Sequence, residues 1–250
     1  MDLIKIALGD YPRYEELLLC KDKFEKEALM WYEEYIRVFG KYHIDLFELK
    51  VECIRLKKLI SLAQMEVNRG EVPHMDKINS IVSEQMTSYY EELKNLVKEH
   101  EASVNAAKIP AHKVQIVKKI YRDIAKVLHP DINPATCEDP NLLELWNRTV
   151  IAYKCNRSEE LEELQVLVNN ALKEKGIDVS KVVIPNIEEK IKQLEDKINA
   201  IITTDPYNYK FLLEDKEETD QRIRDLEEEI EEYGKYKKDL EGVLSELTGE

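Results

Sequence analysis

Apolar residues recur at steps of three or four over most of the first 67 positions, with one local slip shortly after Gly40. The stripe consists of Ala28, Trp31, Tyr35, Val38, Tyr42, Leu46, Leu49, Cys53, Leu56, Ile60, Ala63 and Val67. This spacing predicts a helix over 13–69, and the glycine inside it predicts a bend, because glycine weakens a helix interior. At 1.5 Å per residue such a helix is roughly 85 Å long, so it needs a partner helix.

The predicted partner begins just after Gly70 and Pro73, which end the first helix and block its simple continuation. Its apolar stripe consists of Met75, Ile78, Val82, Met86, Tyr89, Leu93 and Leu96. The short connection makes the two helices antiparallel neighbours. We therefore expect an N-terminal domain over 1–108 that is a long helical hairpin.

A C-terminal coiled-coil hairpin over 186–250 is predicted in the same way, after a linker over 171–185. One stripe starts at Ile187, a turn follows at 203–206, and a second stripe starts at Ile223. This region carries 20 acidic and 10 basic side chains. Such acidity is typical of a solvated coiled-coil exterior, and the alternative interpretation is a docking surface for a basic partner.

Composition favours an all-α fold. The chain is 43% hydrophobic and 35% charged, with only 7 Gly and 8 Pro in 250 residues. So few turn residues argue against sandwiches, barrels and Gly-rich nucleotide folds. The net charge of −14 argues against general binding to nucleic acid or to an anionic membrane surface.

Cysteine spacing and the N-terminal residues bear on the compartment. The four cysteines stand far apart and form no CxxC pair, which argues against a zinc ribbon or a redox motif. A reducing cytoplasm is the simplest interpretation, with disulfides in another compartment as the alternative. The first residues lack the basic start and long apolar core of a signal peptide, and no apolar run reaches the roughly 20 residues that span a bilayer. We therefore expect a cytoplasmic protein.

The segment over 109–170 differs from the hairpins because it joins a basic helix to a loop with two prolines. A helix over 112–128 is predicted to have one broad apolar face, and its other face carries five cations against one acid. His129 and Pro130 end this helix. A further helix starts near Asp139, a good N-cap followed by proline.

Three features of this segment occur together in one protein family. They are a Tyr-Arg-x-hydrophobic-Ala run in a basic helix, a His-Pro-Asp loop, and an aromatic residue six positions before an Ala-Tyr pair. They fall here on Tyr121-Arg122-Asp123-Ile124-Ala125, His129-Pro130-Asp131, Trp146 and Ala152-Tyr153. With them the segment resembles the J-domain of the DnaJ co-chaperones. The resemblance covers about 55 residues, and the combination is far more specific than the tripeptide alone.

The resemblance implies a co-chaperone that binds a DnaK-type chaperone and stimulates its ATPase. It implies that the basic helix docks on an acidic patch of that ATPase and that the loop meets its interdomain linker region. The expected partner-binding residues are His129, Pro130, Asp131, Lys118, Lys119, Arg122 and Lys126, on one outward-facing surface. The expected J-like core consists of Ile120, Tyr121, Ile124, Leu128, Trp146, Ala152 and Tyr153. No catalytic residue, metal ligand or cofactor is expected.

The sequence departs from the family at both ends of this segment. The usual short first helix is not in place, and Tyr89-Tyr90-Glu91-Glu92-Leu93, which resembles its beginning, lacks the glycine and lies more than twenty residues before the second helix. Either the second long helix of the N-terminal hairpin replaces it, as extended first helices do in auxilin-like members, or the domain is degenerate. No Gly/Phe-rich linker and no cysteine-based zinc module follow, so the usual substrate-binding part is absent. The hairpins are then expected to position the domain or to hold a client or partner chain.

Three other interpretations stay open. A coiled-coil adaptor could carry a degenerate, non-activating J-like domain. Nucleic-acid binding through 113–126 is disfavoured, because Gly-rich loops and interleaved exposed aromatics are missing. The long apolar stripes are also compatible with a homodimer. An enzyme with its own chemistry is not expected, because the sequence has no nucleophile elbow, P-loop or HExxH motif.

Overall fold

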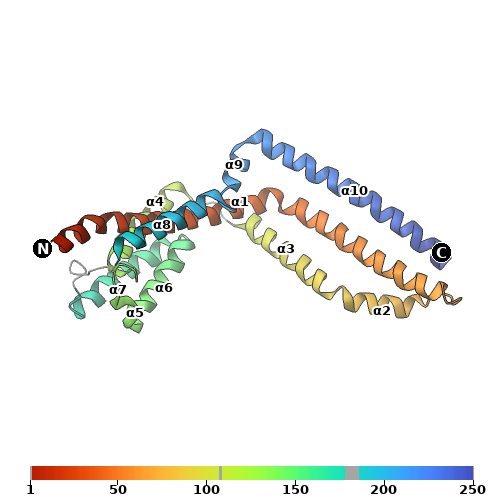
Figure 1. Ribbon diagram of the computed structural model, residues 1–250, viewed down its shortest axis with the longest axis horizontal. Coiled ribbons are helices and arrows are strands. Elements are labelled where there is room, and N and C mark those ends of the chain that lie inside the picture. Colours follow the sequence, from red (N-terminus) through yellow and green to blue (C-terminus); the bar gives the residue numbers. More distant parts are fainter. Residues whose placement is uncertain (1, 107–108, 178–185, 250) are drawn as a thin grey trace. The chain divides into compact units, whose positions relative to one another are not determined.

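The computed structural model describes residues 2–106, 109–177 and 186–249, and for residues 2–11 only the backbone. The protein is all-α: 86% of it is helical, and the described residues contain no strand. The helices within the described ranges are α1 (Asp2–Val67), α2 (Met75–Gln85), α3 (Thr87–Asn105), α4 (Ala111–Leu128), α5 (Ala135–Glu138), α6 (Pro140–Lys154), α7 (Ser158–Glu174), α8 (Ile187–Thr203), α9 (Tyr209–Glu214) and α10 (Lys216–Thr248) (Figure 1).

Local signals set several of the helix ends. Gly70 has φ 79°, a left-handed conformation that glycine adopts freely, and it closes the last turn of α1. Asp139 caps α6: its Oδ1 accepts from the backbone N–H groups of Asn141 and Leu142 at 3.0 and 3.3 Å. Asp215 caps α10 in the same way. The predicted bounds of α4 and the predicted start of α6 are confirmed to within a residue.

The helices form two compact units. Unit 1 contains Met1–Leu29 and Ala107–Tyr207, and unit 2 contains Met30–Ala106 and Asn208–Glu250. The single helix α1 therefore contributes its first turns to one unit and its remainder to the other. The division differs from the predicted sequence of consecutive domains, because the predicted boundaries at 108, 170 and 185 assign all of α1 to one hairpin. Part of the predicted linker, 178–185, lies outside the described residues.

Unit 1 is built around α4, α6 and α7, which contact one another pairwise (Figure 1). Its main core contains sixteen buried residues, all from 117–172. A second cluster joins the start of α1 to α8 and to the loop after α4. Its buried members are Tyr14, Leu18, Ile132, Ile187, Ile191 and Leu194. The α8 stripe thus packs on α1, whereas the prediction paired it with the stripe of α10.

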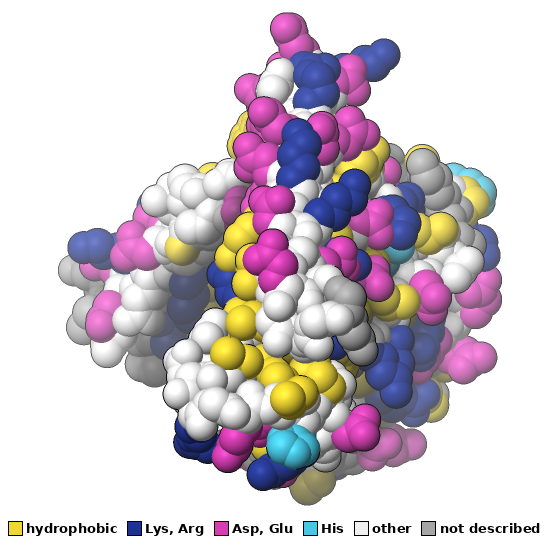
Figure 2. All heavy atoms as spheres, turned by 90° about the vertical axis from the view of Figure 1, so that its right-hand side faces the viewer, with side chains coloured by type: hydrophobic (Ala, Val, Ile, Leu, Met, Phe, Trp, Pro, Cys, Tyr) yellow, Lys and Arg dark blue, Asp and Glu magenta, His cyan; other side chains and the backbone are white. Residues whose placement is uncertain are grey.

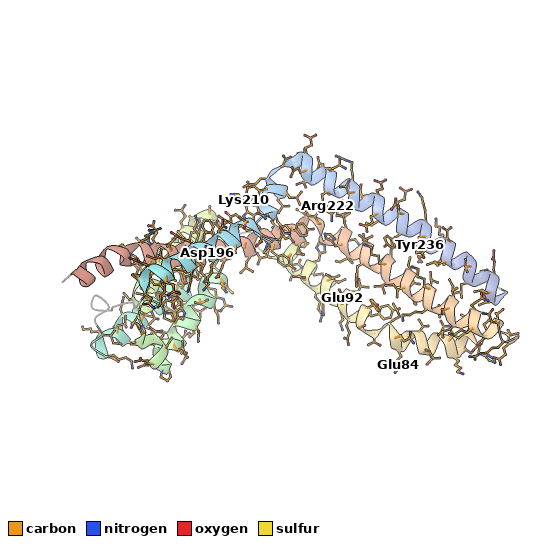
Figure 3. All side chains as sticks on the ribbon, in the orientation of Figure 1. Glu84, Glu92, Asp196, Lys210, Arg222 and Tyr236 are labelled. Atoms are coloured by element: carbon orange, nitrogen blue, oxygen red, sulfur yellow. The ribbon has the colours of Figure 1, made fainter. Side chains whose placement is uncertain are left out.

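Unit 2 packs the rest of α1 against α2, α3 and α10 through two clusters. The cluster with α2 contains Val51, Leu59, Ala63, Ile78, Val82 and Met86, and the cluster with α10 contains Phe39, Leu46 and Leu226. The α10 contacts continue through Lys50, which pairs with Glu229 at 2.7 Å, and through Lys57, whose Nζ lies 4.9 Å from the ring centroid of Tyr236. Figure 3 labels Tyr236 on α10. The predicted second helix of the N-terminal hairpin is present in two pieces, which meet at Met86.

Gly40 lies in an uninterrupted part of α1, where the sequence predicts a bend. The glycine allows the His100 side chain of α3 to approach the backbone of α1 closely. A Cβ at position 40 would lie 2.6 Å from Nδ1 of His100. The same Nδ1 donates to the Ile36 carbonyl oxygen at 3.1 Å. The glycine therefore makes room for a side chain of the facing helix.

Charged side chains of both signs are interspersed on the face shown in Figure 2, with apolar patches between them. Within the described residues, no helix combines the length and the apolar character that crossing a membrane requires.

Candidate functional site

The predicted J-like core residues all lie in one buried cluster of unit 1. They are Ile120, Tyr121, Ile124, Leu128, Trp146, Ala152 and Tyr153, and none is more than 8% exposed. The cluster forms because the apolar stripe of α4 faces α6 and α7, as the 3.6-residue period requires. Val150 packs against the same cluster.

Four rings from α4, α6 and the loop after α4 form a continuous row. Tyr121 stacks on Tyr153 with ring centroids 3.9 Å apart and an interplanar angle of 14°. Tyr121 also contacts Trp146 at 6.0 Å, and the Trp146 indole meets the imidazole of His129 at 4.7 Å. The row therefore connects the middle of α4 to the loop that follows it.

The loop after α4 is closed by its own hydrogen bonds. The backbone N–H groups of Ile132 and Asn133 donate to the His129 carbonyl oxygen at 2.9 and 2.7 Å. The Asn133 amide donates to the Val127 carbonyl oxygen at 3.0 Å, and Asn133 is 1% exposed. These bonds satisfy backbone groups at the end of α4 and fix the direction of the His-Pro-Asp tripeptide.

His129 and Asp131 lie in opposite environments. The imidazole is 8% exposed, whereas Asp131 is exposed and Pro130 is half-buried. The Nδ1 atom of His129 accepts from the Asp131 backbone N–H at 3.1 Å, which is the arrangement of a neutral imidazole. Burial lowers the pKa of His129, and the carboxylates of Asp22 and Asp131 only partly oppose it.

The first turns of α1 cover this site through residues four positions apart. The residues are Tyr14, Leu18, Asp22 and Lys26, which share one face of the helix. Tyr14 and Leu18 are buried with Ile132 of the loop. Burial and the nearby Asp131 carboxylate raise the pKa of Tyr14 to about 12. We call residues 13–28 the cover segment.

Asp22 of the cover segment accepts a hydrogen bond from the hydroxyl of Tyr121. The Tyr121 oxygen and Asp22 Oδ2 are 2.6 Å apart, a short distance typical of an O–H donor on a carboxylate. Burial raises the pKa of Tyr121 well above its ordinary value, and the Asp22 carboxylate adds to the shift. The phenol therefore stays protonated and remains a donor at every physiological pH.

Lys26 places a buried ammonium at the end of α6. It is 3% exposed, and its Nζ donates to the Tyr153 carbonyl oxygen and to Asn156 Oδ1, each at 2.7 Å. The same Nζ lies 3.9 Å from the centroid of the Tyr153 ring. Burial lowers its pKa to about 8, and Lys118 acts in the same direction. A cation at a helix C-terminus is favoured by the helix dipole, which partly offsets the cost of burial.

The four cations of α4 that were named as partner-binding residues divide into two pairs. Lys126 pairs with Glu15 at 3.1 Å and Lys118 pairs with Glu27 at 3.6 Å, so both reach the cover segment. Lys119 and Arg122 are exposed, and their i,i+3 spacing makes them neighbours on the helix surface.

The predicted single outward-facing surface is therefore corrected. The structure leaves Asp131, Lys119 and Arg122 exposed, but it buries the imidazole of His129 and turns two of the four cations toward α1. Charge complementarity explains the two cations, because Glu15 and Glu27 of the cover segment lie opposite them. The imidazole is buried through its contact with the ring of Trp146.

Sequence reasoning missed Tyr14, Asp22, Lys26 and Asn156. A partial signal exists in the steps of four from Tyr14 to Lys26, which continue the helical period of α1 toward its start. The polar side chains at two of these positions conceal that signal, because an apolar stripe traced along α1 begins only at Ala28.

The described residues contain no group of three or more His, Cys, Asp or Glu side chains that could hold a metal ion. A scan against protein-family models, a search of curated proteins and a search of solved structures each found no match.

Proposed function

We propose that this chain is a J-domain co-chaperone that binds a DnaK-type chaperone and stimulates its ATPase through α4 and the His-Pro-Asp loop. The observation that supports it most directly is the loop itself. It follows an amphipathic basic helix, is braced by its own hydrogen bonds, and rests on α6 through the contact of His129 with Trp146.

The exposed charges supply a docking chemistry. Lys119 and Arg122 form a positive strip on α4, and Asp131 is the exposed acid of the loop. A positive strip accelerates and orients association with an acidic partner surface, and the association weakens as salt rises. A DnaK-type partner would place the chain in the cytoplasm, and unit 2 would position the docking unit or hold a client.

The test is single-turnover ATP hydrolysis by a purified DnaK-type chaperone at increasing concentrations of this chain. We expect stimulation with the wild type, loss of stimulation with His129→Gln, and retention with His112→Gln. His112 is an exposed histidine at the start of α4, so it controls for the substitution itself. The proposal would be contradicted if neither the wild type nor Glu15→Lys with Glu27→Lys, which removes two ion pairs between the cover segment and α4, stimulated hydrolysis.

A second candidate is a coiled-coil adaptor whose J-like unit activates nothing. The burial of His129 against Trp146 favours it, because a buried imidazole is not free to contact a partner. The adaptor predicts that Asp131→Asn leaves cellular function unchanged, whereas the co-chaperone predicts loss of function. The comparison requires that the wild type and Asp131→Asn are present in the cell at equal levels.

A further inference from the structure

We infer that residues 13–28 of α1 are a releasable intramolecular cover that competes with the chaperone for α4. The inference rests on the proposed function and adds a closed state to it. In that state the cover segment occupies the surface that the partner needs, and the partner gains access when the segment moves away.

The cover segment runs antiparallel to α4. Glu15 meets Lys126 near the C-terminal end of α4, Asp22 meets Tyr121 in its middle, and Glu27 meets Lys118 one turn further back. The contacts thus follow the same face of α4 over more than two turns. A partner that approached this face would meet α1 first.

The chemistry of the cover segment is that of a competitor. Its three acidic contacts neutralise cations or accept a hydrogen bond on α4, and Tyr14 lies near the Asp131 carboxylate. A partner that uses the cations of α4 must also present acidic groups, because α4 is basic. The expected partner-binding set includes Lys118 and Lys126, so the cover segment occupies two of its four cations and leaves only Lys119 and Arg122 for a partner.

The buried members of the main core of unit 1 come from α4, α6 and α7 and not from the cover segment. Among the described residues, none of the sixteen buried members of the main cluster belongs to α1, and only the partly buried Leu19 packs against it. The segment instead shares its own cluster with α8, to which Arg13 also pairs through Glu195. Only Ile132 connects that cluster to the loop. Release of the α1–α8 pair would break the bonds of Asp22 to Tyr121 and of Lys26 to Tyr153 and would expose that side of the cluster, but it would remove none of the sixteen buried members.

The strength of the ion pairs sets the scale of the effect. The side chains of Lys126 and Lys118 are 42% and 40% exposed. Because solvent screens exposed ion pairs, each of the two contributes little by itself. Losing both is expected to lower the half-maximal concentration for chaperone stimulation roughly three- to tenfold. The two ion pairs are therefore a modest part of what holds the cover segment, and removing them shifts the balance toward release without eliminating the closed state.

The experiment compares two charge-matched double variants. Glu15→Lys with Glu27→Lys removes the two pairs of the cover segment. Glu33→Lys with Glu48→Lys makes the same change in net charge at exposed positions further along α1. Each is measured for stimulation of the DnaK-type ATPase and for acrylamide quenching of Trp146 fluorescence, in a Trp31→Phe background that leaves one indole.

We expect increased quenching and a three- to tenfold lower half-maximal concentration for stimulation in the cover variant, Glu15→Lys with Glu27→Lys, and neither change in the matched control. Adding His129→Gln to the cover variant should abolish its stimulation of the ATPase. Equal stimulation by the cover variant and the matched control would overturn the inference and leave the proposed function standing. Increased quenching with no stimulation by any variant would overturn both. If the double reversal lowers helicity by circular dichroism, Glu15→Gln with Glu27→Gln takes its place, and the same outcomes decide.

Discussion

The imidazole of His129 meets the indole of Trp146 edge to face, with ring centroids 4.7 Å apart and an interplanar angle of 66°. This pair joins the end of α4 to the middle of α6 and keeps the imidazole out of water. The same histidine begins the tripeptide on which the proposed function depends. The conformation of the loop and the burial of its histidine are thus one structural feature.

The first prediction concerns pH. Burial lowers the pKa of His129 below its ordinary 6.5. As the pH falls below 6.5, His129 is therefore protonated more readily in the unfolded chain than in the folded chain. Stability contributed by neutral His129 is therefore full above pH 6.5 and is lost as the pH falls below it. The charges that act on the imidazole are those of Asp22 and Asp131, which raise its pKa, and that of Lys21, which lowers it further. Melting temperatures of the wild type and His129→Gln between pH 7.5 and 5.0 measure the effect.

The wild type should lose more stability over that interval than His129→Gln, whose amide does not titrate. Parallel pH profiles for the two proteins would show that the imidazole is already protonated or accessible in the folded state. His112→Gln, at an exposed position, should follow the wild-type profile.

Among the four rings of the row, Trp146 is expected to contribute most to the stability of unit 1. It is 8% exposed and contacts both Tyr121 and His129. Trp146→Ala should lower the free energy of unfolding by about 3–5 kcal/mol, because removing a buried aromatic leaves a cavity. Trp146→Phe keeps a ring at the position and should cost markedly less. Urea unfolding followed by circular dichroism gives both values, and an unchanged midpoint for Trp146→Ala would contradict the assignment.

The hydrogen bond between Tyr121 and Asp22 can be isolated by a double-mutant cycle. Tyr121→Phe and Asp22→Asn each remove or weaken it, and a hydrogen bond to a charged group contributes about 1.5–3 kcal/mol. The coupling energy should therefore be positive and exceed roughly 1 kcal/mol. Hydrogen exchange in residues 13–28 provides a second measurement, because loss of the bond should accelerate exchange there. Additive effects in the cycle would argue that the cover segment is held by its other contacts alone.

Structural features that depend only on residues close together in the sequence could be predicted from it. The bounds of α4, the Asp139 cap and the left-handed Gly70 each follow from signals within a few positions. The cover segment could not be predicted, because its polar contacts join residues far apart along the chain. Asp22 lies 99 positions from Tyr121, and Lys26 lies 127 positions from Tyr153. A carboxylate or ammonium becomes a plausible buried residue only when its distant partner is known.

The pairing of the C-terminal stripes shows the same limit. A heptad stripe indicates that a helix needs an apolar partner, but it does not identify which helix provides it. The stripes of α8 and α10 were expected to meet each other because they are adjacent in sequence. In the structure each packs on α1, the α8 stripe on Tyr14 and Leu18 and the α10 stripe on Phe39 and Leu46. A helix as long as α1 has enough apolar face to accept both.

The last prediction concerns Gly40, where helix propensity and packing oppose each other. Alanine favours a helix interior over glycine by about 1 kcal/mol. At this position, however, the added Cβ would lie 2.6 Å from Nδ1 and 3.1 Å from Cγ of His100, so the ring must move and lose its bond to the Ile36 carbonyl oxygen. Overpacking of this kind costs typically about 1–3 kcal/mol. Gly40→Ala should therefore destabilise the chain, by roughly 1 kcal/mol after the gain in propensity.

Two other glycines in helix interiors provide the matched control. Gly234 and Gly242 lie in α10, and a Cβ at either would meet no atom within 4 Å apart from the adjacent residues and backbone of its own helix. Gly234→Ala and Gly242→Ala should each raise the free energy of unfolding by about 0.5–1 kcal/mol, since only propensity changes. His100→Ala should reverse the sign of Gly40→Ala, because the obstructing ring is then gone. Urea unfolding of these variants separates the two contributions, and stabilisation by Gly40→Ala in the presence of His100 would show that α3 does not pack against α1 at this point.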